Sequence, residues 1–178
     1  MTDFARLLEA EIPRLRRYAR ALTRDVTRAD DLVQSCLTRA VAKQHLWQPG
    51  TDLRAWLFTI LRNEFYSQMR KRGREVQDTD GAFTERMSVH PSQYGILDMA
   101  DFKKALDGLP PDQREAIILI GASGFSYEEA ADICHCAVGT MKSRVSRART
   151  RLQEQLGISG EADYGPDSVS AQVTSQGF

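Results

Sequence analysis

Apolar residues along the chain recur at intervals of three and four positions, the spacing that places side chains on one face of an α-helix. In the first half this pattern predicts a helix over Phe4 to Leu22 and another from Leu53 to Arg72. Between them, Thr27 followed by Asp30 is similar to a capping box and predicts the start of a further helix. Alternating strand-like segments and hairpin turns are rare, so we expect an all-α fold.

The second half carries shorter helical segments with clear boundary signals. A helix is predicted near residues 98–109, and Pro111 suits the first turn of the next one. Ser126 and Glu129 form a capping box that opens a short helix. After the turn "HCA", the stretch "AVGTMKSRVSRARTRL" predicts a longer basic helix.

Composition divides the chain into two helical domains. Residues 74–96 are polar, without helical periodicity and rich in acids, so we expect a flexible acidic linker between a domain at 1–73 and a domain at 97–156. Residues 157–178 contain no Lys or Arg and have a composition typical of disorder.

The whole-chain composition indicates an ordinary soluble protein. Of 178 residues, 42% are hydrophobic and 27% charged, and no run approaches the ~20 apolar residues of a membrane helix. The N-terminal sequence lacks an apolar signal segment, so we expect a cytoplasmic protein that does not contact a membrane.

The cysteines do not suggest a disulfide framework or a metal centre. Cys36 stands alone, and Cys134 and Cys136 are separated by one residue, closer than the usual ligand spacing of a zinc site. We therefore expect buried thiols, no metal and no cofactor.

Positive charge is concentrated in two helices although the formal net charge is zero. The segment 62–74 and the segment 142–151 are both rich in Lys and Arg, with the acidic connector between them. Two basic helices of this kind indicate two contacts with one polyanion.

The last predicted helix combines an apolar stripe with a polar face. The stripe consists of Val138, Met141, Val145, Ala148 and Leu152. At about 100° per residue, Thr140, Ser143 and Arg147 lie opposite it, whereas Arg149 lies close to it. A short capped helix, a tight turn and a longer basic helix form the helix-turn-helix pattern, whose second helix enters the major groove of DNA. A solvated basic helix in a small bundle is the alternative.

Two segments resemble the extracytoplasmic-function sigma factors of bacterial RNA polymerase. "LPPDQREAIILIGASGFSYEEAADICHCAVGTMKSRVSRARTRL" is similar to their region 4, and "RADDLVQSCLTRAV" with "DLRAWLFTILRNEFYSQMRKR" to their region 2. "WQPGTDLRAWLFTIL" and "GASGFSYEEAADIC" further resemble the general-stress-response subgroup.

The resemblance implies roles for particular residues. The polymerase-binding positions would be Asp30, Asp31, Leu32, Val33 and Gln34. The positions that contact the promoter −10 element, including a loop that captures a flipped base, would be Trp47, Gln48, Thr51, Asp52, Arg62, Asn63 and Tyr66. The −35 duplex would be read by Thr140, Lys142, Ser143, Arg144, Ser146 and Arg147. Trp47 could equally belong to the core, and the family often has a larger residue at the position of Ser146.

The resemblance also implies the partners: core RNA polymerase, promoter DNA as −35 duplex and −10 single strand, and an anti-sigma factor wedged between the two domains. The chain would then select promoters without catalysing a reaction itself. A stand-alone helix-turn-helix activator or repressor is the alternative, but it would not need the second basic helix. No phosphate-binding loop or catalytic triad supports an enzyme.

Overall fold

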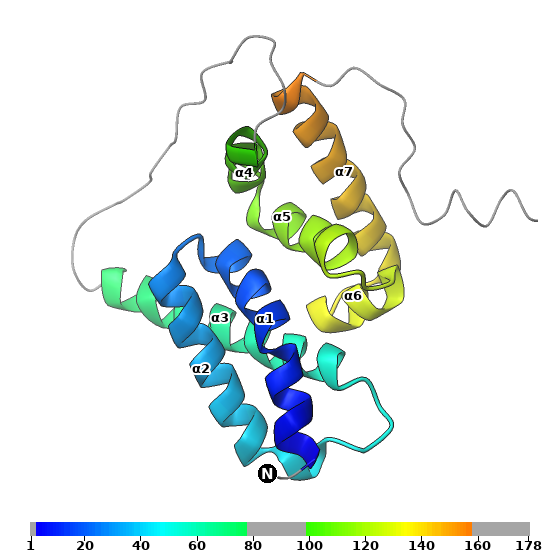
Figure 1. The fold of residues 1–178 in the computed structure, drawn as a ribbon. Coiled ribbons are helices and arrows are strands. Elements are labelled where there is room, and N and C mark those ends of the chain that lie inside the picture. Colours follow the sequence, from blue (N-terminus) through cyan, green and yellow to red (C-terminus); the bar gives the residue numbers. More distant parts are fainter. Residues whose placement is uncertain (1–2, 78–98, 158–178) are drawn as a thin grey trace, which may run out of the picture.

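The computed structural model of the protein describes residues 3–77 and 99–157, and all regular structure in these two ranges is helical (Figure 1). The all-α prediction is therefore confirmed, with two helical domains. The tail predicted for 157–178 lies outside the described residues except for Gly157, and so does most of the predicted linker.

The first domain is a three-helix unit. Its helices are α1 (Asp3–Thr23), α2 (Val26–Ala42) and α3 (Leu53–Gln77), and a short 3₁₀ turn, η1 (Gln44–Leu46), follows α2. Helix α1 continues through Pro13. Figure 1 shows α1 and α2 side by side, and α3 crosses behind them. Their inward faces form a core that includes Leu15, Leu32 and Leu61.

Two helix boundaries differ from the sequence prediction. The capping box predicted at Thr27 is wrong: α2 begins at Val26, and the Oδ1 atom of Asp25 accepts the cap hydrogen bond from the Arg28 amide at 2.8 Å. The cause is local, because Arg24 takes a positive φ of 57° and turns the chain earlier. Helix α3 continues to Gln77, beyond the predicted end at Arg72. The domain and linker limits themselves stay predictions.

The second domain contains four α-helices. These are α4 (Met99–Asp107), α5 (Pro111–Ile117), α6 (Tyr127–Cys134) and α7 (Val138–Leu156). Pro111 occupies the first turn of α5, as predicted. After Ile117 the helix does not stop at once but widens into one π-helical turn, η2 (Ile118–Ala122).

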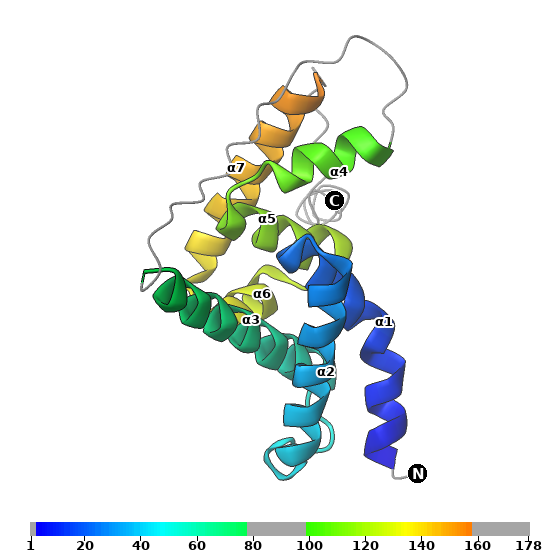
Figure 2. The ribbon, with the colours of Figure 1, turned by 90° about the vertical axis from the view of Figure 1, so that its left-hand side faces the viewer.

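The two domains pack against each other in a closed arrangement. In Figure 2, α6 lies next to α3, and α5 lies next to α1. The Tyr18 ring of α1 stacks on Phe58 of α3, with ring centroids 4.7 Å apart, and Phe58 meets Phe125 of the second domain edge-to-face at 4.9 Å. The Arg54 guanidinium stands 4.2 Å from the centroid of the Phe125 ring.

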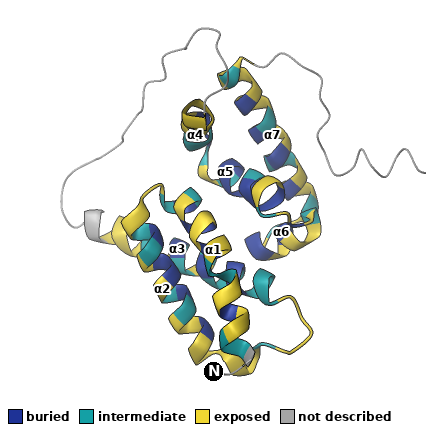
Figure 3. Ribbon diagram, viewed as in Figure 1, coloured by how far each residue is buried: buried dark blue, intermediate teal, exposed yellow. Residues whose placement is uncertain are grey.

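The resulting core is continuous across the domain boundary. The largest cluster of buried apolar residues contains side chains from both domains, as the dark faces turned toward each other in Figure 3 illustrate. A smaller cluster joins α4 to α7 through Ala105, Leu109, Ala148 and Leu152. In the described ranges, no helix is both long and apolar enough to cross a membrane.

Candidate nucleic-acid interface

Helices α6 and α7 form the helix-turn-helix that the sequence predicts. Ser126 accepts a hydrogen bond from the Glu129 amide at 3.1 Å, and the Glu129 carboxylate accepts one from the Ser126 amide at 2.7 Å. At the other end of α6, His135 adopts a left-handed conformation with φ of 52° and begins the short turn 135–137 that leads to α7. The tight turn fixes the angle at which α7 leaves α6.

The helical phase of α7 agrees with the sequence analysis. Met141, Val145, Ala148 and Leu152 are buried, while Val138 is only partly buried. On the other faces, the predicted −35 positions Thr140, Lys142, Ser146 and Arg147 are exposed, and Ser143 and Arg144 are half-buried.

The polar side chains of α7 are braced by neighbours. Lys142 Nζ lies 5.5 Å from the centroid of the Tyr127 ring, and Arg147 donates a long hydrogen bond of 3.4 Å to Ser143 Oγ. The Ser143 hydroxyl itself donates to the Thr140 carbonyl oxygen at 2.9 Å. Thr140, Ser143 and Arg147 thus lie together on one face of α7, whereas Lys142 lies on another side of the helix and extends over Tyr127 of α6.

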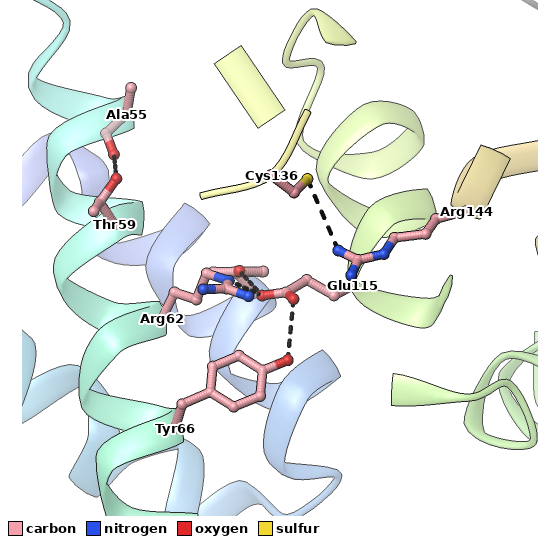
Figure 4. Close-up of polar contacts among 8 residues, drawn as sticks. Ala55, Thr59, Arg62, Tyr66, Glu115, Cys136 and Arg144 are labelled. Carbon is pink, nitrogen blue, oxygen red and sulfur yellow. Dashed lines mark hydrogen bonds and ion pairs between the residues drawn. The ribbon is translucent and has the colours of Figure 1, made fainter. Parts of the chain in front are cut away.

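Arg144 has a different environment from the other predicted −35 residues. Its Nε atom lies 3.4 Å from the Asp112 carboxylate on α5, and its guanidinium points to the Cys136 sulfur at 3.9 Å (Figure 4). Only 24% of its side chain is exposed. The arginine therefore ties α7 to α5 and to the turn before α7.

The residues predicted to capture a flipped base lie in the loop directly before α3. Thr51 Oγ1 donates to the Gln48 carbonyl oxygen at 2.7 Å, and the Asp52 carboxylate accepts from the Ala55 amide at 3.1 Å, which supports the start of α3. Gln48, Thr51 and Asp52 are exposed. The Trp47 ring is half-buried and lies against the ring of Phe4, with centroids 5.5 Å apart.

The three predicted −10 residues on α3 do not all point the same way: one side chain faces solvent and two face the second domain. Asn63 is exposed to solvent. Arg62 and Tyr66 instead point toward the second domain, as Figure 4 shows, and both reach the carboxylate of Glu115 on α5.

Glu115 is the centre of a buried polar cluster between the domains. Its Oε1 atom accepts hydrogen bonds from Tyr18 Oη at 2.8 Å and Arg62 Nε at 2.9 Å, and its Oε2 atom accepts from Tyr66 Oη at 3.1 Å. Only 1% of the Glu115 side chain is exposed, and 15% of that of Arg62. All three donors come from the first domain, whereas the acceptor comes from the second.

The cluster shifts the pKa values of its members. Burial, followed by the nearby Glu115 charge, raises the pKa of Tyr66 to about 12, and the same two causes raise the pKa of Tyr18 well above its ordinary value. For Arg62, burial is the largest single influence and lowers the pKa, but the attraction of Glu115, its hydrogen bond and the nearby Cys134 and Tyr66 together outweigh burial, so the net shift is upward. Both tyrosines therefore stay protonated donors, and Arg62 stays a cation.

The predicted polymerase-binding segment occupies the first turns of α2. Asp31 and Gln34 are exposed, and Asp30 is half-buried, with its carboxylate 3.5 Å from Arg16 of α1. Leu32 and Val33 lie in the core. The surface available to a partner here is therefore that of Asp31 and Gln34, and the two apolar residues hold α2 in place.

Two of the three cysteines are buried as the sequence analysis expected, and Cys136 is not. Cys36 and Cys134 are buried, and burial raises the pKa of each to about 12. Cys136 is partly exposed. Within residues 3–77 and 99–157, no group of three His, Cys, Asp or Glu side chains has an arrangement that could hold a metal ion.

Comparison with known proteins identifies the family. Residues 8–62 match the family described as "Sigma2 domain of PhyR", and residues 99–152 match "Sigma-70, region 4". The chain is also 54% identical to the ECF RNA polymerase sigma factor EcfG of Rhodopseudomonas palustris, over 92% of this chain and 91% of that protein. The protein belongs to the extracytoplasmic-function sigma factors. The resemblance found in the sequence is thereby confirmed.

Solved structures show that this sigma factor shares its fold with proteins held in complexes, one of them a sigma factor bound by an anti-sigma factor. The sigma factor RpoE of Bartonella quintana, solved with the anti-sigma factor NepR, is 62% identical with a TM-score of 0.78, covering 90% of this chain and 100% of that one. CnrH, solved with the cytosolic domain of CnrY, is 25% identical with a TM-score of 0.64, over 88% and 89% of the two chains.

Sequence reasoning missed Glu115 of this sigma factor. The sequence analysis assigned no role to this residue, yet only 1% of its side chain is exposed. One signal was present: Glu115 is followed directly by "AIILI", so an acid stands at the edge of an apolar run. An acid in such a place is usually paired when it is buried.

Proposed function

We propose that this sigma factor guides core RNA polymerase to promoters by reading two DNA elements with two separate helices. The exposed face of α7 around Arg147 reads the −35 duplex, and the loop 47–52 with α3 binds the −10 element. The observation that carries the proposal is the pairing of a helix-turn-helix with a second basic helix on another domain. The chain contributes no catalytic group, because the polymerase performs the chemistry.

The exposed side chains suit these tasks. Arg147, Lys142 and Thr140 offer donors that can meet phosphates or guanine edges in the major groove. On the first domain, Gln48, Thr51 and Asn63 are exposed polar groups next to a loop of the type that could hold an extruded base. Asp31 and Gln34 form the contact with the polymerase.

A similar sigma factor that was solved in complex with an anti-sigma factor supports the same kind of regulation for this chain. RpoE of Bartonella quintana is bound by the anti-sigma factor NepR, and its 62% identity supports a partner of the same kind for this chain. Such a partner would wedge between the two domains and keep the protein from the polymerase. We place this activity in the cytoplasm, with stress-response genes as its targets, in keeping with the likeness to EcfG.

Co-purification with core polymerase tests the proposal. We expect a stable complex with core RNA polymerase and only weak binding of promoter duplex by the free protein, because its net charge is zero. A gel-shift titration at physiological salt measures the second quantity. Tight and specific binding of duplex DNA by a dimer of the free protein, without association with polymerase, would favour the stand-alone repressor instead.

A further inference from the structure

Glu115 accepts hydrogen bonds from two side chains that the family resemblance assigns to the promoter −10 element. Arg62 and Tyr66 lie on α3 among the predicted −10 residues, yet both donate to the Glu115 carboxylate at 2.9 and 3.1 Å. A carboxylate and a phosphate are both anionic oxygen acceptors, and arginine binds either of them. The second domain thus supplies an anion where the first domain is expected to bind a nucleic-acid strand.

We propose that Glu115 is an intramolecular competitor of promoter DNA, and that the −10 strand reaches Arg62 and Tyr66 only after the two domains separate. This inference rests on the proposed function. The contact is a latch of four residues, consisting of Tyr18, Arg62, Tyr66 and Glu115. Tyr18 belongs to it although no role in DNA binding is assigned to that residue.

The energetics of the latch suit a reversible contact. The attraction within a buried ion pair is offset by the desolvation of both charges, so the pair itself adds little net free energy to the closed state, which the apolar core shared by the two domains also stabilises. Removing one partner while the domains stay closed leaves a buried charge unpaired, which is strongly unfavourable. The closed arrangement is therefore stable while all four latch residues are present. The loss of any one of them favours separation of the domains.

Glu115→Gln breaks the latch with little change of shape. The amide keeps the size of the side chain but removes the charge that faces Arg62, so we expect the ratio of open to closed molecules to rise about tenfold or more. Tyr18→Phe is a second variant, which keeps the ring stacked on Phe58 and deletes only the hydroxyl donor to Glu115. For this variant we expect a rise of about fivefold.

Glu154→Gln is the matched control. Glu154 lies on α7 of the same domain and is exposed, so its neutralisation changes the net charge as Glu115→Gln does but leaves the latch intact. A gain in DNA binding that arises only from the lost negative charge would appear equally in this control.

Two measurements on the full-length chain test the proposal. Single-molecule energy transfer between dyes at Lys43→Cys, directly after α2, and Lys104→Cys on α4, in a Cys136→Ser background, reports the open fraction. Fluorescence anisotropy with a labelled single-stranded DNA pool of mixed sequence reports binding by the variants without dyes. We expect Glu115→Gln and Tyr18→Phe to raise the open fraction and to tighten DNA binding by about the same factor, because only open molecules bind.

Two results would overturn the proposal. In one, both latch variants keep the open fraction of the wild type and of Glu154→Gln. In the other, the latch variants open but bind the DNA pool no more tightly than the control does. Failure of the proposed function is a separate result, since it would appear as absence of a complex with core polymerase whatever the open fraction.

Discussion

Arg147 and Arg149 stand two positions apart on α7 but differ in exposure, and this difference separates two kinds of DNA contact. Arg147 is exposed opposite the buried stripe, whereas Arg149 is half-buried beside it. An arginine that reads a base contributes about 1–3 kcal/mol at one position of the site, while a phosphate contact strengthens all sequences alike. We therefore expect Arg147→Ala to change which −35 sequences are used, and Arg149→Ala at most to lower activity uniformly.

The measurement is transcription by reconstituted holoenzyme from promoters that carry every single −35 substitution, at two salt concentrations. Ser143→Ala is included to test the neighbouring hydroxyl, and its effect should be smaller than that of Arg147→Ala. A preference profile that Arg147→Ala leaves unchanged and Arg149→Ala reshapes would mean that the DNA-facing side of α7 has been assigned wrongly.

The tyrosines of the latch make the closed arrangement sensitive to alkaline pH. The pKa of Tyr66 is raised to about 12, so its protonated form is favoured in the folded, closed protein. This stabilisation is complete below the ordinary tyrosine pKa of about 10 and is lost as the pH rises toward about 12. Ultraviolet absorbance of tyrosinate should show late titration of two of the five tyrosines.

Glu115→Gln provides the control for this titration. Because the Glu115 charge is one of the causes of the raised pKa values, the variant should bring the late titration closer to that of the other tyrosines. A wild-type protein in which all tyrosines titrate together would contradict the buried cluster.

At the scale of single elements, the capping box of α6 fixes how the recognition helix is presented. Ser126 caps α6, and α6 supports α7 through a turn of a few residues. Ser126→Ala should destabilise the second domain by about 1 kcal/mol, with the loss measured by urea denaturation followed by circular dichroism. Ser67→Ala, at an exposed site within α3, should stay within about 0.5 kcal/mol of the wild type. Equal stability of the two variants would argue against the cap.

Elements set by local interactions could be predicted from the sequence, and contacts between distant segments could not. The cap of α6 and the proline at the start of α5 involve residues within a few positions of each other, so their signals are visible in a short window. The stripe of α7 follows from one helical period. The start of α2 was placed wrongly because the left-handed turn at Arg24 leaves no mark in a periodic pattern.

The polar cluster at Glu115 illustrates the second case. Its donors stand 97, 53 and 49 positions away in the chain, and no sequence window joins them. The candidate −10 residues Arg62 and Tyr66 were found from the sequence through the family resemblance, but the direction of their side chains depends on how the domains pack. The exposed faces of α2 and α7, by contrast, follow from helical phase alone.

At the scale of the whole molecule, the account requires a contact with polymerase that is separate from DNA reading. Asp31 is exposed on α2, so Asp31→Arg should change stability by no more than about 0.5 kcal/mol and yet abolish assembly with core polymerase. Co-purification of the variant with core enzyme measures assembly, and thermal unfolding verifies the fold. Glu9→Arg, at an exposed acid of α1, makes the same charge change elsewhere and should assemble normally. Unchanged polymerase binding by Asp31→Arg would show that the docking surface lies elsewhere.

The central claim is that one chain reads two promoter elements as a subunit of RNA polymerase. Run-off transcription from a library of randomised promoters, with core polymerase and the purified full-length protein, tests it most directly. The account predicts transcripts only when both components are present, from promoters that share two separate conserved elements, with Asn63→Ala altering preference in the −10 element and Arg147→Ala in the −35 element. Transcription that is independent of this protein, or selection of a single element that responds to neither substitution, would contradict it.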